Sequence, residues 1–217
     1  MPGMETVILV HGLYMTGAEL GFLRRRLARV HGFRTRIFRY RSVGASLVEN
    51  AERLQAFVAE SEGPRVHLLG HSLGGVVLVQ MLQASPPESA GRVVCIGSPL
   101  RGSSLARAYA RVPLGRHLVG RSMSDAQADG AVPPWRGARE LGIIAGSLPL
   151  GFGTLLGVVP GPSDGTVSVE ETRLAGASDH LVLPLCHLSM LFSTQVADQS
   201  AVFFREGHFQ HEGRAAA

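Results

Sequence analysis

The stretch "VHLLGHSLGGVVL" (residues 66–78) places one serine between two glycines, with apolar runs on both sides. Its centre, "GHSLG" (70–74), has the spacing G-x-S-x-G and falls where an apolar strand ends and an apolar helix begins. A turn this sharp strains its central residue and crowds the positions two before and two after it, so that only glycine fits there. We therefore interpret Ser72 as a candidate nucleophile at the positive end of a helix. A helix N-cap flanked by glycines is the simpler alternative.

Alternating apolar runs supply the elements that position this serine. Runs that suit strands occupy residues 5–10, 35–40, 65–70, 92–97, 141–147 and 180–184. Apolar spacing of about 3.6 residues predicts helices at 18–30, 46–61, 72–84, 104–112 and 187–198. Apolar strands that alternate with helices predict an α/β fold, with a mostly parallel central sheet and helices on both faces. The length predicts a single domain over residues 1–217.

Three segments do not follow this alternation. Residues 99–138 are rich in Gly, Pro, Ser and Arg and are too long for an ordinary loop, so we expect a lid-like insertion over the site. The tail, residues 205–217, is small and polar enough to be frayed. Residues 141–163 carry no charge, but glycines and prolines interrupt them, which favours a strand and an apolar loop over a membrane span.

All 21 basic residues are arginines, against 17 acidic residues, and the isoelectric point is near 9.8. This indicates a compositional bias rather than nucleic-acid binding, and we expect no nucleic-acid partner. Eight arginines and no acid lie between Arg24 and Arg41. We interpret them as solvated faces of a helix and a strand, with peripheral contact to an anionic membrane or an acidic substrate as the alternative. No signal peptide is recognisable, so we expect a cytoplasmic protein.

Beyond the serine motif, four segments carry a resemblance to a known family. They are "VILVHGLYMTG" (7–17), "CIGSPLRGS" (95–103), "PSDGTVSVEETRL" (162–174) and "CHLSMLFSTQV" (186–196). With these segments the chain resembles α/β-hydrolase-fold serine hydrolases, and most of all the small bacterial lipases and esterases without a large cap domain. The resemblance implies the α/β-hydrolase fold. It also implies that the catalytic residues follow in the order Ser, then Asp or Glu, then His.

A serine nucleophile needs a general base, and the chain order of the family restricts the choice to late histidines. His187 follows an apolar strand and precedes a helix, which places it at the same sheet edge as Ser72. The other late histidines, His180, His208 and His211, begin a strand or lie in the tail. We expect His187 to be the base, and a helix-start histidine is the alternative.

The base in turn needs a carboxylate that orients it. Asp164, in "PSDGTV", follows the strand 141–147 and can turn back over the sheet edge. Asp179 directly precedes a strand and belongs at the opposite edge, where a turn-forming role explains it. Asp164 is the preferred acid, although Asp-Gly is also a turn dipeptide. Glu170 and Glu171 are further alternatives.

The oxyanion of a tetrahedral intermediate requires two N–H donors. The backbone N–H of Leu73, directly after the nucleophile, is one candidate. The resemblance implies the N–H of Leu13 as the other and a bracing role for His11. We expect His71 to neighbour the substrate pocket rather than to act as a second base.

Two segments contain apolar side chains that could cover the site, and Leu105 and Trp135 are our candidates for substrate contact. The alternative is that these side chains pack inward as core. They are Leu105, Val112, Leu114, Leu118, Val119 and Trp135 in the first segment, and Leu148, Leu150, Phe152, Leu155, Leu156 and Val158 in the second.

Together these residues predict hydrolysis of a small-molecule or lipid carboxylic ester through an acyl-enzyme on Ser72, without cofactor or metal. Acyl transfer and thioester hydrolysis use the same groups and remain alternatives. A non-catalytic α/β-hydrolase scaffold that binds a lipid or a protein is the alternative from another class. Such a scaffold has no need of the serine, the late histidine and the loop aspartate together.

Overall fold

The computed structural model describes residues 3–85, 91–112, 119–128 and 132–211, which form a six-stranded parallel sheet in the order β2-β1-β3-β4-β5-β6. The strands are β1 (Thr6–Val10), β2 (Arg34–Phe38), β3 (Val66–His71), β4 (Val93–Ile96), β5 (Leu141–Gly146) and β6 (Asp179–Leu183). Each begins and ends within two residues of its predicted range. The predicted α/β fold with a mostly parallel sheet is therefore confirmed.

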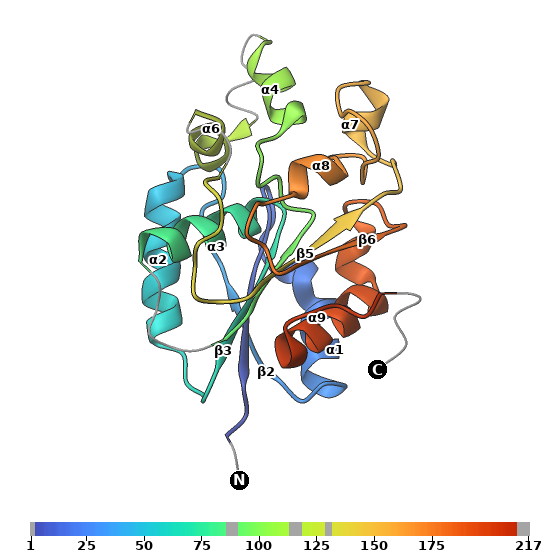
Figure 1. Ribbon diagram of the computed structural model, residues 1–217. Helices are drawn as coiled ribbons and strands as arrows, with labels where there is room; N and C mark the ends of the chain where they lie inside the picture. The colour runs from blue at the N-terminus through green and yellow to red at the C-terminus, as the bar shows by residue number, and fades with distance from the viewer. Residues whose placement is uncertain (1–2, 86–90, 113–118, 129–131, 212–217) are drawn as a thin grey trace.

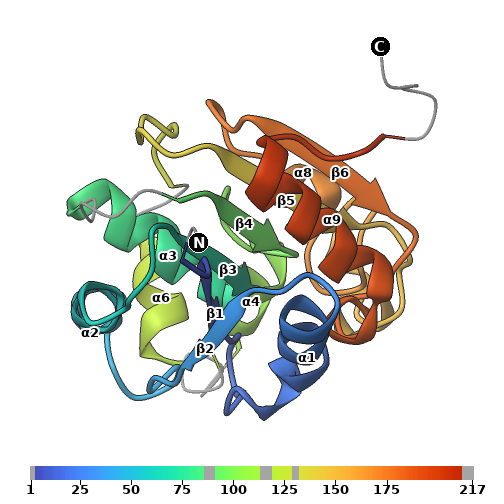
Figure 2. The same ribbon diagram turned by 90° about the horizontal axis from the view of Figure 1, so that it is seen from below.

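Helices cover both faces of this sheet (Figures 1 and 2). α1 (Gly21–Arg29) and α9 (Thr194–Glu206) lie on one face, and α2 (Leu47–Ala59) and α3 (Leu73–Ala84) lie on the other. Side chains alternate along a strand, so Val7 and Leu9 of β1 pack toward α1 and α9, whereas Ile8 and Val10 pack toward α2 and α3. Burial on both faces explains why the central strands are apolar throughout.

Shorter elements gather above the carboxyl ends of the strands (Figure 1). They are α4 (Ser104–Ala110), α6 (Arg121–Ala128), α7 (Phe152–Leu155) and α8 (Val169–Thr172). Because parallel strands deliver their carboxyl ends to one edge, these elements form the rim of any site built there. The 3-10 turns η1 (Ala18–Leu20) and η2 (Ser189–Phe192) lead into α1 and α9.

The expectation of a lid over residues 99–138 does not fit α6, which is anchored to α2. Met123 is buried in the core, and the Ser122 hydroxyl donates a hydrogen bond to the Ala45 carbonyl at 2.8 Å. Asp125 accepts the N–H of Leu47, the first residue of α2, at 3.0 Å. Leu114 and Leu118 lie outside the described residues, as does the side chain of Phe152.

The C-terminal helix begins and ends later than the predicted range 187–198, and the tail is ordered as far as His211. A 3-10 turn follows His187, Ser193 then caps α9, and Gly207 in the left-handed conformation ends it. Phe209 is buried against Phe203, with ring centroids 4.8 Å apart. The sequence analysis missed this buried aromatic residue because most of the surrounding tail is polar.

Several of the arginines between Arg24 and Arg41 are engaged on the outer surface of the fold. Arg26 forms a bidentate pair with Asp198, with both N···O distances at 2.7 Å, and Arg36 lies 4.0 Å over the ring of Phe57. The contact with an anionic membrane stays a prediction. None of the described helices combines the length and the apolarity that crossing a bilayer requires.

Candidate active site

Ser72 lies in a sharp turn between β3 and α3, with φ 55° and ψ −125°. Tyr14 is the other non-glycine residue with positive φ in the described part of the chain. Such a conformation costs on the order of 1–3 kcal/mol and persists only where the surroundings hold it. Here the Ser72 N–H donates to the Ile96 carbonyl at 2.9 Å, and the Ser72 carbonyl accepts the Gly75 N–H at 3.0 Å. The turn presents the hydroxyl at the carboxyl edge of the sheet.

Close backbone approach explains both glycines of the motif. A Cβ atom on Gly70 would lie 2.6 Å from the Gly75 backbone, and one on Gly74 would lie 2.3 Å from the Val10 carbonyl oxygen. Both distances are far inside van der Waals contact. The first turn of α3 can therefore pack against β3 and β1 only without side chains at these two positions, as the sequence predicted.

The structure brings Asp164 and His187 together. Oδ2 of Asp164 lies 2.7 Å from Nδ1 of His187, and the Asp164 carbonyl accepts the His187 N–H at 2.9 Å. Oδ1 accepts the N–H groups of Thr166 at 2.8 Å and Val167 at 2.7 Å, so the fully buried carboxylate is held on both oxygens. The pair fixes the Nδ1–H tautomer of His187, which leaves Nε2 as the acceptor.

Gly97, directly after β4, lies close to this pair, and its neighbour in the chain contacts Ser72. A Cβ atom on Gly97 would lie 3.0 Å from Oδ2 of Asp164 and 3.2 Å from Nδ1 of His187. The residue before it, Ile96, accepts the N–H of Ser72. Within the described residues the Ser72 hydroxyl itself makes no hydrogen bond, and the side chain is 9% exposed. Hydrogen bonds between nucleophile and base are often long in proteins without substrate.

The alternative acids lie elsewhere. Asp179 begins β6 at the opposite edge, where it accepts the Phe209 N–H at 2.8 Å and contacts Nε2 of His211 at 2.9 Å. Its role is thus wider than the predicted turn, because it attaches the tail. Glu170 is exposed and pairs with arginines, and Glu171 caps α8 and accepts the N–H of Ser104.

His11 and Tyr40 brace the loop that carries Gly12 and Leu13. The His11 Nδ1–H donates to the Gly12 carbonyl at 2.9 Å, and its Nε2 accepts the Tyr40 N–H at 3.3 Å. The Tyr40 hydroxyl donates to the His11 carbonyl at 2.8 Å, and the two rings stack at 4.4 Å. Burial lowers the pKa of His11, which keeps the ring neutral in this arrangement.

The braced loop approaches Ser72 closely, since a Cβ atom on Gly12 would lie 3.1 Å from the Ser72 Cβ. In the described residues neither the Leu13 N–H nor the Leu73 N–H has a hydrogen-bond partner. Leu73 begins α3, where N–H groups have no partner within the helix. The sequence analysis missed Tyr40, although its place at the end of the predicted strand 35–40 pointed to this edge.

His71, which we expected to neighbour the substrate pocket, lies in the interior against His187, and its contact with substrate stays a prediction. It is fully buried, and its Nε2–H donates to the His187 carbonyl at 3.1 Å. Nδ1 has no hydrogen-bond partner in the part of the chain that the structure describes. Burial, followed by the neighbouring His187, holds the pKa of His71 well below 6.5, so the ring is neutral.

The two apolar candidates for substrate contact lie in different parts of the structure. Leu105 is half-buried on α4, at the rim of the site. Trp135 is instead a core residue, which corrects the prediction. Its indole N–H donates to the Arg139 carbonyl at 2.9 Å, and its backbone N–H donates to the Ala175 carbonyl, near the amino end of β5.

The model of the alpha/beta hydrolase family matches residues 7–216. The chain belongs to this family. Solved α/β hydrolases with a similar fold include a Bacillus licheniformis lipase, BlEst2 in its mature form, with a TM-score of 0.71 and 19% identity over 95% of this chain and 93% of the other. No curated protein sequence matches the chain significantly.

Two esterase structures also share the hydrolase fold. The metagenomic carboxyl esterase MGS0156 has a TM-score of 0.69 and 17% identity, over 94% of this chain and 76% of the other. The carboxylesterase CesB from Bacillus subtilis has a TM-score of 0.59 and 15% identity, over 94% of this chain and 84% of the other. These likenesses extend over most of the hydrolase chain, at low sequence identity.

Proposed function

We propose that this α/β hydrolase is a serine esterase that cleaves carboxylic esters through an acyl-enzyme on Ser72. The observation that carries the proposal is the buried Asp164–His187 hydrogen bond at 2.7 Å, at the same sheet edge as the strained serine. The lipase and esterase folds among its structural neighbours support the same class of reaction.

In this mechanism His187 Nε2 takes the proton of the Ser72 hydroxyl as its oxygen attacks the ester carbonyl. Asp164 stabilises the imidazolium that forms and keeps the ring in place. The N–H groups of Leu73 and Leu13 donate to the oxyanion of the tetrahedral intermediate. His187 then protonates the leaving alcohol, and a water activated by the same nitrogen hydrolyses the acyl-enzyme.

Labelling with a fluorophosphonate probe tests the nucleophile directly, because the probe forms a covalent bond with an activated serine only. The wild-type protein should be labelled, Ser72→Ala should not, and the distant control Ser61→Ala should be labelled as the wild type is. Absence of labelling in a folded wild-type protein, together with no hydrolysis of p-nitrophenyl esters, favours the non-catalytic scaffold and overturns the proposal.

A further inference from the structure

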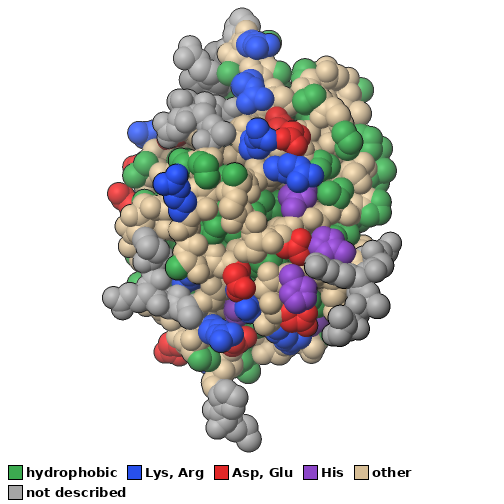
Figure 3. All heavy atoms as spheres, in the orientation of Figure 1, with side chains coloured by type: hydrophobic (Ala, Val, Ile, Leu, Met, Phe, Trp, Pro, Cys, Tyr) green, Lys and Arg blue, Asp and Glu red, His purple; other side chains and the backbone are tan. Residues whose placement is uncertain are grey.

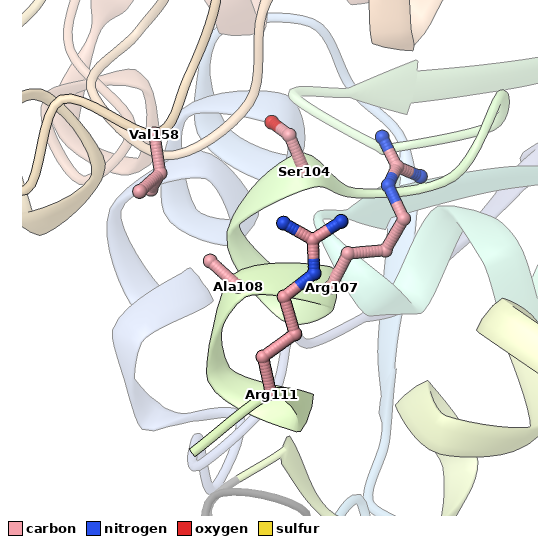
Figure 4. Close-up of a pocket in the computed structure, with 5 residues that line it drawn as sticks. All are labelled: Ser104, Arg107, Ala108, Arg111 and Val158. Atoms are coloured by element: carbon pink, nitrogen blue, oxygen red, sulfur yellow. The ribbon is translucent and has the colours of Figure 1, made fainter.

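A cavity of about 240 Å³ lies between α4 and the segment that follows α7 (Figure 4). We call it the arginine pocket. Figure 4 shows the guanidinium group of Arg111 turned back along α4 toward Ser104, with Val158 across the cavity on the other segment. Its lining residues are Ser104, Arg107, Ala108, Arg111 and Val158.

The polar groups of the arginine pocket are suited to an anion. The Ser104 hydroxyl oxygen is buried and has no hydrogen-bond partner among the described residues. Arg111 is exposed, and no acidic group of the described residues pairs with it. Arg107 lies 3.6 Å from Glu171, whose carboxylate also accepts the N–H groups of Ser104 and Ser168. The pocket therefore keeps an unneutralised positive charge beside a hydroxyl that lacks a partner.

Within the described parts of the chain, the surroundings of the arginine pocket do not cancel this charge. Figure 3 shows basic side chains in a row over α4 and α8. Glu170, the exposed acid in this region, already pairs with Arg101 and Arg173. A guanidinium group binds phosphate and carboxylate oxygens through charge-assisted hydrogen bonds, which are the stronger class of hydrogen bond.

Chain connections keep the arginine pocket within reach of the candidate active site. Ser104 follows Gly97, which touches the Asp164–His187 pair, by seven residues, a distance of at most about 25 Å in an extended chain. Two turns, closed by the N–H groups of Leu100 and Gly102, shorten that path. On the other side, Val158 precedes Asp164 by six residues. The arginine pocket therefore belongs to the rim of short helices above the sheet edge that carries Ser72 (Figure 1).

We infer that the arginine pocket binds a negatively charged end, a phosphate or a carboxylate, of the ester that Ser72 attacks. The inference rests on the proposed function and names its substrate class: esters with an anionic group separated from the reacting carbonyl by an apolar spacer. Ala108 and Val158 supply the apolar wall along which such a spacer lies.

Matched substrates test this assignment. Mono-4-nitrophenyl esters of succinate, adipate and suberate carry a terminal carboxylate, and p-nitrophenyl alkanoates of the same acyl length do not. The ratio of kcat/KM for the anionic ester to that for the neutral ester should rise with spacer length in the wild type. In Arg111→Gln the ratio for suberate should fall about tenfold, as loss of a charged hydrogen bond predicts. Arg29→Gln, an exposed arginine at the end of α1, is the matched control and should keep the wild-type ratio.

Competition distinguishes the two sources of the anion. If the pocket is built for phosphate, inorganic phosphate should inhibit suberate ester hydrolysis more strongly than acetate does, and if it is built for carboxylate the order should reverse. Either inhibition should weaken in Arg111→Gln. An unchanged ratio in Arg111→Gln, or an equal fall in Arg29→Gln, overturns the inference while leaving ester hydrolysis intact.

A second readout separates this inference from the proposed function. Inorganic phosphate should raise the melting temperature of the wild type and of Arg29→Gln, but not that of Arg111→Gln. If no ester is hydrolysed and this pattern holds, the proposed function fails and the anion site stands. If the melting temperatures of all three proteins respond alike, the site is rejected.

Discussion

His71 donates a hydrogen bond from Nε2 to the backbone carbonyl of His187 at 3.1 Å, and the two rings lie 4.7 Å apart. On its other side, a Cβ atom on Gly12 would lie 3.3 Å from Nδ1 of His71. The buried imidazole therefore lies between the candidate base and the loop that carries Gly12 and Leu13. It supports the backbone of one and packs against the other, so it is a positioning residue for the reaction proposed above.

We predict that His71→Phe lowers kcat about fivefold with KM nearly unchanged, because the carbonyl of His187 loses about 1 kcal/mol of hydrogen bonding that holds the base. Folding should tolerate the change, since the ring is kept and Nδ1 had no partner to lose. Steady-state kinetics and melting temperatures measure both effects. His71→Gln can still donate and should retain more of kcat, and equal kcat in wild type and His71→Phe would contradict the role.

Ser72→Ala should fold normally and lose nearly all hydrolysis, about 10³-fold or more, because only the oxyanion donors and substrate binding remain. Removing the hydroxyl leaves the strained backbone held by the hydrogen bonds to Ile96 and Gly75. Turnover of p-nitrophenyl butyrate by a sample free of wild-type enzyme is the measurement. More than a tenth of wild-type turnover in that sample rules out Ser72 as the nucleophile.

Asp164→Asn should damage activity far more than Asp179→Asn. At position 164 the amide cannot stabilise the imidazolium and favours the wrong tautomer of His187. At position 179 the change weakens the attachment of Phe209 and His211, so it should lower the melting temperature instead. Parallel measurements of kcat/KM and of melting temperature separate the two effects, and a larger activity loss in Asp179→Asn would reverse the assignment of the acid.

Stability should fall in mild acid through histidines that are held neutral in the fold. Burial, with Arg173 nearby, lowers the pKa of His180 from 6.5 to about 4, while the Nε2–H donates to the Thr172 hydroxyl. Because the folded pKa is the lower one, the unfolded chain binds the proton more readily between these values. The stabilisation is therefore complete above about pH 6.5 and is lost as the pH falls toward about 4.

His180→Gln, which keeps a donor toward Thr172, should consequently show a shallower decline of the unfolding free energy between pH 6.5 and pH 4. Chemical denaturation across this range measures the slope. His208→Gln is the matched control, because His208 is exposed. Identical slopes in wild type and His180→Gln would show that another group causes the acid sensitivity.

The sequence predicted the sheet well because burial on both faces leaves continuous apolar runs with no competing pattern. It predicted the sharp turn at Ser72 for a similar reason, since close backbone contacts at Gly70 and Gly74 exclude every other residue type. The juxtaposition of Asp164 and His187 followed from chain order and from the common edge of parallel strands. A local sequence pattern is enough to predict a structural feature where a single steric requirement determines that feature.

Long-range packing decided the features that the sequence did not predict. Trp135 lies in a Gly- and Pro-rich segment whose composition suggested a cover over the site. Its ring nevertheless packs in the core, and its indole N–H donates to the Arg139 carbonyl. Phe209 lies among polar letters, and only its contact with Phe203 makes it an anchor. Tyr40 acts through the backbone of His11, 29 residues away in the chain. The hydrophobic periodicity of the sequence carries no information about such long-range contacts between single side chains.

The range of acyl chains depends on apolar side chains beside the candidate site that do not pack inward. Leu150 and Leu155, in the segment before Asp164, are 63% and 81% exposed, so they are not core. They offer apolar surface to an acyl chain, and each methylene that they bury contributes about 0.8 kcal/mol, or roughly fourfold in kcat/KM.

For neutral p-nitrophenyl esters we therefore predict that kcat/KM rises with chain length, peaks between about four and ten acyl carbons and then declines as the apolar surface is filled. Replacement of Leu150 with Ser should lower the peak and move it to shorter chains, whereas replacement of the distant, exposed Val30 with Ser should leave the profile unchanged. Amides should be poor substrates, because their leaving group demands closer positioning of His187 for proton transfer. A profile that still rises at sixteen carbons would contradict the limited surface, and peptidase activity without esterase activity would contradict the substrate class itself.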